Sequence, residues 1–155
     1  MEKEKGFTLL EMVVVMAILA ILSTGFVSGI RWQYKQQMVS AAGEIEQLIQ
    51  VMQQEAALKN CMYVLDKSHR EGQDILRVEV DTRTLYEYTL PRTLKVYIGT
   101  KDNPIGVERE ISFRQDLSPS SSGTITLRHA KYPYQLQMTV RPVTGIVTLY
   151  PLQRY

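Results

Sequence analysis

The chain contains very little cysteine and histidine. Its 155 residues include one cysteine, Cys61, and two histidines, His69 and His129. One thiol cannot form an intrachain disulfide, so the fold must be held by its own apolar core, and we expect Cys61 to be a small buried side chain near the end of a helix. Neither histidine has partners at a metal-ligand spacing. This predicts no metal site and two solvated histidines, His69 in a turn and His129 at a strand end or in a loop.

Motifs for cofactor chemistry are also missing. The sequence has neither a G-x-G-x-x-G loop nor a loop ending in G-K-S or G-K-T, either of which would cradle phosphates. We therefore predict no cofactor and no catalytic residue, and we expect that the chain is not an enzyme.

Charge is absent from a long stretch near the N-terminus. Residues 12–30 are a run of 19 uncharged, largely apolar residues, which as a helix would span ~29 Å, about the hydrocarbon thickness of a bilayer. Glu11 directly precedes this run, and no Lys or Arg lies between Gly6 and Ile30 to neutralise it. A carboxylate in or near a membrane segment is costly, so Glu11 needs a partner.

Two ordinary explanations of this segment are a secretory signal peptide and a plain membrane anchor. A signal peptide has a net-positive leader, a shorter apolar core and a small-residue cleavage site such as the one at 22–25, whereas here two acids balance two lysines within residues 1–5. A plain anchor accounts for the apolar run but leaves Glu11 unexplained.

Residues 5–11 read Lys-Gly-Phe-Thr-Leu-Leu-Glu, and this pattern resembles the type III signal of type IV prepilins and pseudopilins. The resemblance implies that a prepilin peptidase cuts after Gly6 on the cytoplasmic side and methylates the new amino terminus of Phe7. It also implies an assembly role for Glu11, whose charge the amine of a neighbouring subunit would neutralise. A free helix N-terminus favours an acid in its first turn as well.

The same resemblance implies the partners and the location of the chain. The partners are prepilin peptidase, other pilins or pseudopilins, and an assembly ATPase with its membrane platform protein. The precursor would cross the bacterial inner or plasma membrane once, with its C-terminal part outside the cytoplasm. The mature subunit would then enter a periplasmic or cell-surface filament.

Proline is absent before Pro91, and this permits a long helix. Beyond the uncharged run, apolar residues recur at alternating spacings of four and three, the period of a helical stripe: Tyr34, Met38, Ala41, Ile45, Leu48 and Met52. We predict one helix from about Phe7 to about Lys59, apolar all round in its first half and amphipathic in its second. Many major pilins carry a proline late in the membrane segment. Here Gly25 and Gly29 favour either a flexible point or close helix packing.

From Met62 onward the apolar period changes to two, which is typical of strands. The alternation predicts strands at 75–80, 86–88, 95–98, 110–113, 123–127, 136–140 and 146–150, with turns in Pro, Gly and Ser clusters such as 118–123. We therefore predict an antiparallel β domain packed on the amphipathic half of the helix.

The C-terminal part resembles a narrower group within the same family. Phe113, a turn rich in Pro, Ser and Gly, the strand 123–127 and Gly145 follow one another as in minor pseudopilins of the general secretion H type and their competence and FimT-like relatives. Such relatives often carry an arginine after the late glycine, and in FimT-like pilins basic residues near the end contact DNA. Here that position is Ile146.

Acids are absent after Asp116, and the later charged side chains are all basic: Arg128, Lys131, Arg141 and Arg154. Tyrosines lie between them, and basic residues with aromatic neighbours suit sequence-independent contact with phosphates and bases. DNA is therefore a candidate partner of the C-terminal part. The alternative is four solvated residues on scattered strand faces, with the tyrosines half-buried between strands.

Together these patterns predict an α+β, pilin-like chain in which a long N-terminal helix packs on a C-terminal antiparallel β domain. Its parts would be a cleaved leader (1–6), a transmembrane or filament-core helix (7–30), an amphipathic helix half (31–60) and a β-rich head (61–155). The predicted function is that of a minor type IV pilin or pseudopilin, a structural subunit of a filament that serves secretion, pilus biogenesis or DNA uptake. The alternative is a filament-borne DNA-binding receptor pilin for transformation.

Overall fold

The structure, a computed structural model, describes residues 8–100, 102–103, 105, 110–114, 116 and 119–155, with the backbone alone for residues 24–28 and 31. The chain forms two compact units, Met1–Gln36 and Gln37–Tyr155. The leader and the predicted cleavage site between Gly6 and Phe7 lie outside the described residues.

Helix α1 comprises Leu9–Lys59, 51 residues, and confirms the predicted long helix. It ends where Asn60 adopts a left-handed conformation with φ of 56°, in which asparagine can cap the C-terminus of a helix. In the part of the chain that the structure describes, no helix combines the length and the hydropathy needed to cross a membrane.

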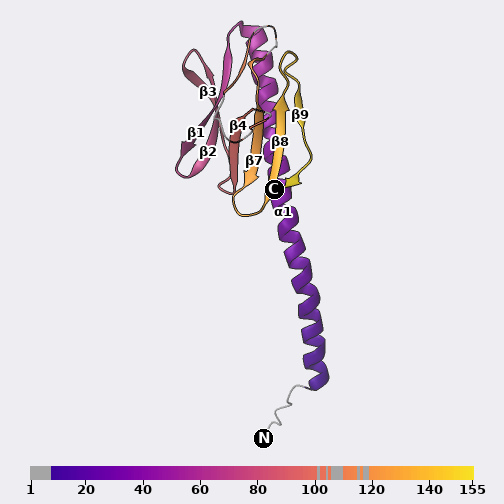
Figure 1. The fold of residues 1–155 in the computed structure, drawn as a ribbon. Coiled ribbons are helices and arrows are strands. Elements are labelled where there is room, and N and C mark those ends of the chain that lie inside the picture. Colours follow the sequence, from indigo (N-terminus) through magenta and orange to yellow (C-terminus); the bar gives the residue numbers. More distant parts are fainter. Residues whose placement is uncertain (1–7, 101, 104, 106–109, 115, 117–118) are drawn as a thin grey trace. The chain divides into compact units, whose positions relative to one another are not determined.

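The second half of α1 supplies part of the core of the unit 37–155. Its buried residues recur every three or four positions: Met38, Ala41, Ala42, Ile45, Ile49, Met52 and Ala56. This pattern confirms the predicted amphipathic stripe, although Leu48 is only partly buried. Figure 1 shows the strands of this unit gathered around the same part of α1.

The described residues form two antiparallel sheets, labelled here A and B (Figure 1). Sheet A has the order β3-β2-β1-β5-β6, with β1 Tyr63–Arg70, β2 Gln73–Val80, β3 Arg83–Thr89, β5 Ile111–Phe113 and β6 Pro119–Ser121. Sheet B has the order β10-β8-β7-β4 with β9 beside β8, and contains β4 Leu94–Gly99, β7 Thr124–His129, β8 Tyr134–Val140, β9 Val147–Leu149 and β10 Gln153–Arg154.

Each sheet buries one apolar face against α1. Successive side chains of a strand point to opposite faces, so every second residue reaches the core. The strand residues in the common core cluster include Leu65, Leu76, Val78, Ile111 and Phe113 of sheet A, and Val96, Ile98, Ile125, Leu127, Leu136 and Met138 of sheet B. The alternation in the sequence predicted these strands because its apolar residues face the core and its polar residues face the surface.

Three strands lie outside the predicted set. β1 carries mostly polar residues after Leu65, so it has no clean alternation, yet it occupies the centre of sheet A between β2 and β5. The stretch around His69, which was predicted to lie in a turn, continues β1 as far as Arg70, and the chain turns only at Glu71 and Gly72. β6 forms within the predicted turn 118–123, and β10 is a two-residue strand beside β8.

A buried carboxylate connects the two sheets. Asp74 on β2 is 3% exposed, and its Oδ2 accepts a hydrogen bond from the backbone N–H of Val96 on β4 at 2.9 Å. Its Oδ1 lies 2.9 Å from Nδ1 of His69, and the Nζ atoms of Lys67 and Lys95 lie 3.8 and 3.9 Å from the carboxylate. Burial by itself raises the pKa of Asp74, but these partners outweigh it and hold the pKa below its ordinary value.

Candidate functional site

The N-terminus of α1 is closed by hydrogen bonds between Thr8 and Glu11. The Oε2 atom of Glu11 accepts from the backbone N–H of Thr8 at 2.9 Å and from its hydroxyl at 3.0 Å. In return, the Thr8 Oγ1 atom accepts from the backbone N–H of Glu11 at 3.3 Å. This arrangement is a capping box, in which each side chain satisfies the backbone donor of the other residue.

The capping box gives Glu11 a partner that the sequence reasoning missed. No Lys or Arg lies near Glu11 in the sequence, whereas Thr8 offers uncharged donors. The spacing Thr-x-x-Glu before an apolar run is the signal that would have identified it. The assembly role of Glu11 stays a prediction. Gly6 and Phe7, the other predicted site residues at this end, lie outside the described residues.

Arg128 has the most contacts of the four late basic residues. It lies on β7, and the Cζ atom of its guanidinium is 4.1 Å from the centre of the Tyr155 ring. Its Nε and Nη2 atoms donate to Oε1 of Gln135 on β8 at 3.3 and 3.2 Å. The stacked ring and the amide hold the guanidinium in place while leaving it partly exposed, as contact with an anion requires.

Lys131 and Arg154 lie at the same end of sheet B as Arg128, but Arg154 lies on the opposite face of the sheet from Arg128. Lys131 is exposed in the connection between β7 and β8. Arg154 is the residue after Gln153, which pairs with Gln135. Because neighbouring residues of a strand alternate between faces, Arg154 points to the face opposite Arg128.

The structure separates Arg141 from the other three. Arg141 follows Val140, the last residue of β8, whereas Arg128 pairs with Gln135 near the start of that strand. Six residues at ~3.4 Å each place these positions about 20 Å apart along the sheet. The four predicted contact residues therefore do not form one compact patch.

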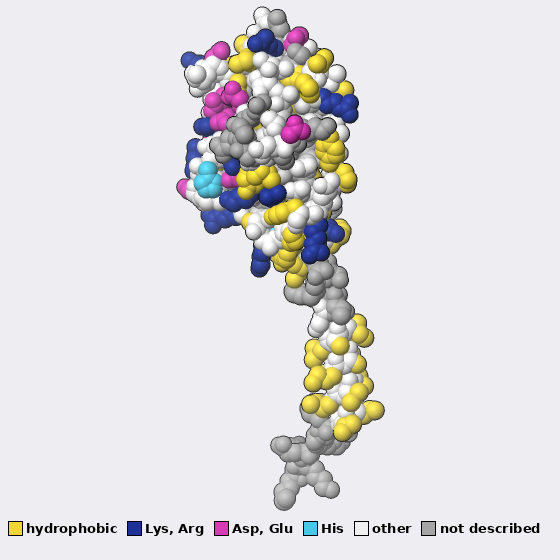
Figure 2. Space-filling model, in the orientation of Figure 1, with side chains coloured by type: hydrophobic (Ala, Val, Ile, Leu, Met, Phe, Trp, Pro, Cys, Tyr) yellow, Lys and Arg dark blue, Asp and Glu magenta, His cyan; other side chains and the backbone are white. Residues whose placement is uncertain are grey.

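Sequence reasoning missed Lys95, which lies beside Arg128. The two residues are paired in register on β4 and β7, so their side chains share one face of sheet B. We call Lys95, Arg128 and Lys131 the basic face. Figure 2 shows Lys and Arg side chains over the drawn side of the unit 37–155, and hydrophobic side chains over the N-terminal half of α1. The register of β4 against β7, which brings Lys95 to Arg128, cannot be read from the residues near Lys95.

Both histidine predictions need correction. His69 is exposed but lies in strand β1, where it contacts the buried Asp74. His129 does lie at a strand end, but it is 2% exposed because its side chain points to the core face of β7. Its Nδ1 atom accepts from the backbone N–H groups of Lys131 and Tyr132, each at 3.1 Å. Burial, followed by the charge of Lys131, lowers the pKa of His129.

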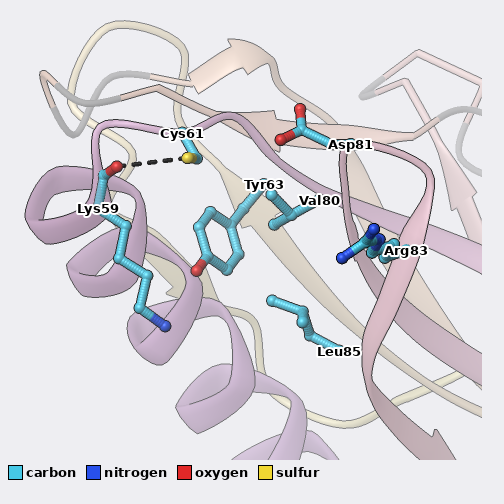
Figure 3. A pocket seen from close by; sticks show the side chains of 7 residues that line it. All are labelled: Lys59, Cys61, Tyr63, Val80, Asp81, Arg83 and Leu85. Atoms are coloured by element: carbon cyan, nitrogen blue, oxygen red, sulfur yellow. Dashed lines mark hydrogen bonds between the residues drawn. The ribbon is translucent and has the colours of Figure 1, made fainter.

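Cys61 lies at the end of α1 as predicted, but it is only partly buried. Its thiol donates to the backbone carbonyl of Lys59 at 3.3 Å, as Figure 3 shows. The side chain lines an open pocket beside the helix end. The expectation that Cys61 is a buried core residue is therefore wrong.

Comparison with known proteins finds a sequence similarity at the N-terminus and structural similarities that cover most of the chain. Residues 1–27 match the family model of the prokaryotic N-terminal methylation motif. No curated protein matches the chain in sequence.

Among solved structures, the type IV minor pilin FimU of Pseudomonas aeruginosa strain PAO1 is similar in two crystal forms. One has a TM-score of 0.58 at 17% identity and covers 77% of this chain and 92% of FimU. The other has a TM-score of 0.54 at 17% identity, covering 72% and 91%.

The minor pseudopilin EpsH from the Type 2 Secretion System of Vibrio cholerae has a TM-score of 0.53 at 12% identity, and the match covers 74% of this chain and 96% of EpsH. The chain therefore has the pilin fold, a long N-terminal helix packed on an antiparallel β domain. The chain thus combines the N-terminal methylation motif with the fold of a minor pilin and a minor pseudopilin.

Proposed function

We propose that the chain is a minor pilin or pseudopilin that is processed and then built into a filament through its N-terminal helix. The methylation motif over residues 1–27, on a chain with the minor pilin fold, is the observation that carries this proposal. Prepilin peptidase cuts after Gly6 and methylates Phe7. Glu11 then aligns the entering subunit with the cationic amino terminus of its neighbour, because a carboxylate in an apolar setting is stable only beside a countercharge.

The proposed route begins at the membrane. The precursor is held there as a single-pass protein by the uncharged segment 12–30, with its C-terminal part outside the cytoplasm. A platform protein and an assembly ATPase move the mature subunit into a short periplasmic or cell-surface filament with other pilins. The other subunits that co-purify with it identify the apparatus as one for secretion, pilus biogenesis or DNA uptake.

Mass spectrometry of the protein from its native host tests the processing step. We expect the mature chain to begin at methylated Phe7. A Gly6→Leu variant, whose larger side chain blocks the peptidase, should keep its leader and remain at the membrane. A wild-type chain that begins at Met1, or beyond Ser23, would contradict the proposal.

Three substitutions separate the two roles of Glu11. Glutamine at the third helical position can still form a capping box, so Glu11→Gln removes the charge alone and should block incorporation into filaments. Thr8→Ala removes the cap at a cost of about 1 kcal/mol of helix stability but keeps the charge, and should assemble. Glu11→Ala should fail as Glu11→Gln does. The reverse result, with Glu11→Gln assembling and Thr8→Ala failing, would make Glu11 a cap and nothing more.

DNA binding is a second candidate function, favoured by the basic face. Lys95 and Arg128 share one face of sheet B, and Lys131 lies in the adjoining connection. The guanidinium of Arg128 is held by Tyr155 and Gln135. Such a surface contacts phosphates without reading sequence, so its affinity for DNA depends strongly on salt.

A salt series on the unit 37–155 tests this function. Three phosphate contacts give a slope of about −3 in a plot of log affinity against log salt. Arg128→Ala should reduce the magnitude of that slope by about 1, whereas Arg141→Ala, which removes the same charge about 20 Å away, should leave it unchanged. Absence of binding at 50 mM salt would exclude DNA as a partner.

A further inference from the structure

An open pocket of about 510 Å³ lies beside the C-terminal end of α1. Its lining comes from the helix end, the start of β1 and the β2–β3 hairpin, and comprises Lys59, Cys61, Tyr63, Val80, Asp81, Arg83 and Leu85 (Figure 3). We call it the Tyr63 pocket. None of these residues belongs to the predicted processing site or to the basic face.

The inner wall of the pocket is apolar and fixed in position. Tyr63 is 1% exposed, and its hydroxyl donates to Oε2 of Glu55 at 3.0 Å. Lys59 forms an ion pair with the same carboxylate. Burial, followed by the hydrogen bond to Glu55, raises the pKa of Tyr63. The charges of Lys59 and Glu55 thus satisfy each other, and Val80 and Leu85 add apolar surface beside the Tyr63 ring (Figure 3).

The outer edge of the pocket carries a cation with no counterion in the described part of the chain. Arg83 is exposed at the start of β3 and its guanidinium points toward the pocket, whose lining also includes Asp81 on the same hairpin (Figure 3). A second pocket shares Cys61 and is lined also by Asn60, Met62 and the exposed Arg114. Each of the two adjoining pockets therefore has one exposed arginine, and Asp81 is the single acid among the described lining residues of the Tyr63 pocket.

The turn that shapes this edge adopts an uncommon conformation. Asp81 and Thr82 have φ of 48° and 67°, the left-handed region that a two-residue hairpin turn of this kind requires at both central positions. Glycine or asparagine normally occupies such positions, and a β-branched residue there is strained. Strain of this kind is found where a binding surface is held in a fixed shape, and here the turn fixes the backbone from which the Arg83 side chain extends.

We propose that the Tyr63 pocket binds a segment of a different filament subunit that carries an apolar side chain beside an acidic one. The apolar side chain would pack against Val80 and Leu85, over the buried Tyr63 ring, and the carboxylate would form a charge-assisted hydrogen-bonded pair with Arg83. A two-fold contact in which this pocket met the same pocket of a second copy would instead bring Arg83 against Arg83. The proposal rests on the proposed function, because it names a partner within the same filament.

Photo-crosslinking in assembled filaments tests the proposal with the full chain. A photoreactive amino acid replaces Leu85, which is 46% exposed, or Leu149 on sheet B, which is 43% exposed and serves as the matched control. After irradiation, mass spectrometry identifies the adducts. We expect Leu85, but not Leu149, to be joined to an acidic, apolar segment of another pilin of the filament.

Charge reversal tests the role of Arg83 in the same filaments. Arg83→Glu should reduce the Leu85 adduct about tenfold, the effect of losing one charge-assisted hydrogen bond, and changing the acid at the mapped partner site to lysine should restore it. Arg92→Glu, an exposed arginine before β4, should leave the adduct unchanged.

Other outcomes overturn the proposal. These are no Leu85 adduct from filaments that contain the chain, an adduct only to a second copy, or an adduct that Arg83→Glu does not reduce. A chain that is absent from purified filaments would overturn the proposed function itself, and the pocket proposal with it.

Discussion

Asp74 is the residue whose side chain joins the two sheets. β4 is an edge strand of sheet B, and an edge leaves backbone N–H groups without a strand partner. The Asp74 carboxylate, on β2, accepts a hydrogen bond from one of these groups, the backbone N–H of Val96. Two lysines and a histidine surround the same carboxylate, so its charge is stabilised although the side chain is almost fully buried.

We expect Asp74→Asn to lower the free energy of unfolding of the unit 37–155 by about 1.5 to 3 kcal/mol, the range for hydrogen bonds to a charged group. Asp66→Asn is the matched control. Its partner Arg77 lies 3.0 Å away but both side chains are partly exposed, so the loss should be at most about 1 kcal/mol. Urea denaturation of the three proteins measures the difference. Equal effects would contradict the role given to Asp74.

The stabilisation by Asp74 also predicts a dependence on pH. The pKa of Asp74 is lower in the folded state than its ordinary value of 3.8. The contribution is therefore fully present above pH 3.8 and is lost as the pH falls from there through the folded-state pKa. The stability difference between wild type and Asp74→Asn should thus shrink in this acid range, which denaturation at pH 7 and at successively lower pH would measure.

At the scale of the secondary-structure elements, two glycines differ in whether the structure has room for a side chain at their position. A Cβ on Gly123, at the start of β7, would lie 2.9 Å from the carbonyl oxygen of Gly99 at the end of β4. These strands are neighbours in sheet B, so the contact is between two backbones that cannot easily move apart. A Cβ on Gly43, within α1, would meet nothing within 4 Å.

We therefore expect Gly123→Ala to destabilise the unit 37–155 by about 1 to 3 kcal/mol, the usual cost of overpacking. Gly43→Ala should stabilise it by up to about 1 kcal/mol, because alanine is the better helix former. Thermal unfolding followed by circular dichroism compares the two variants. A stabilising Gly123→Ala would mean that β4 and β7 do not approach as closely as described.

The sequence predicts those elements whose periodicity reflects burial. α1 and the strands with regular alternation are confirmed because their buried residues recur at the helical or the strand period. β1 is missed because Lys67 and His69 lie on its inward side, where they face Asp74 rather than an apolar core. That arrangement depends on a partner strand and cannot be inferred from β1 alone.

The candidate sites are predictable to the extent that they are local in the sequence. Glu11 is identified because it is an isolated acid directly before an uncharged run. Its capping partner, Thr8, is identified because it lies three residues before Glu11. The basic face depends instead on strand register, which pairs Lys95 with Arg128 and leaves Arg141 at the far end of β8. The Tyr63 pocket combines a helix end with a hairpin, so no single sequence pattern marks it.

At the scale of the whole molecule, the unit 37–155 has a core of its own. The core cluster begins at Met38 and draws on α1 and both sheets, and none of the side chains that the structure describes within 8–36 belongs to it. The core thus does not depend on the part of α1 that is proposed to enter the membrane or the filament.

We expect removal of residues 1–36 to leave the unfolding free energy of the unit 37–155 unchanged to within about 0.5 kcal/mol, the usual effect of changes away from the core. Tyrosine fluorescence in urea, for the fragment and for the full chain in detergent, gives this comparison. Ile49→Ala, at a fully buried core position, should cost about 2 to 5 kcal/mol in both. A fragment that is unfolded without denaturant would contradict an independent core.

The partly exposed thiol at the edge of the Tyr63 pocket has a practical consequence. Because Cys61 is the sole cysteine in the sequence, a maleimide dye attaches at one known position without any prior mutation of the protein. Its fluorescence would respond to changes in polarity beside the helix end. The wild-type chain thus already contains a place for an optical reporter that can follow its partners in real time.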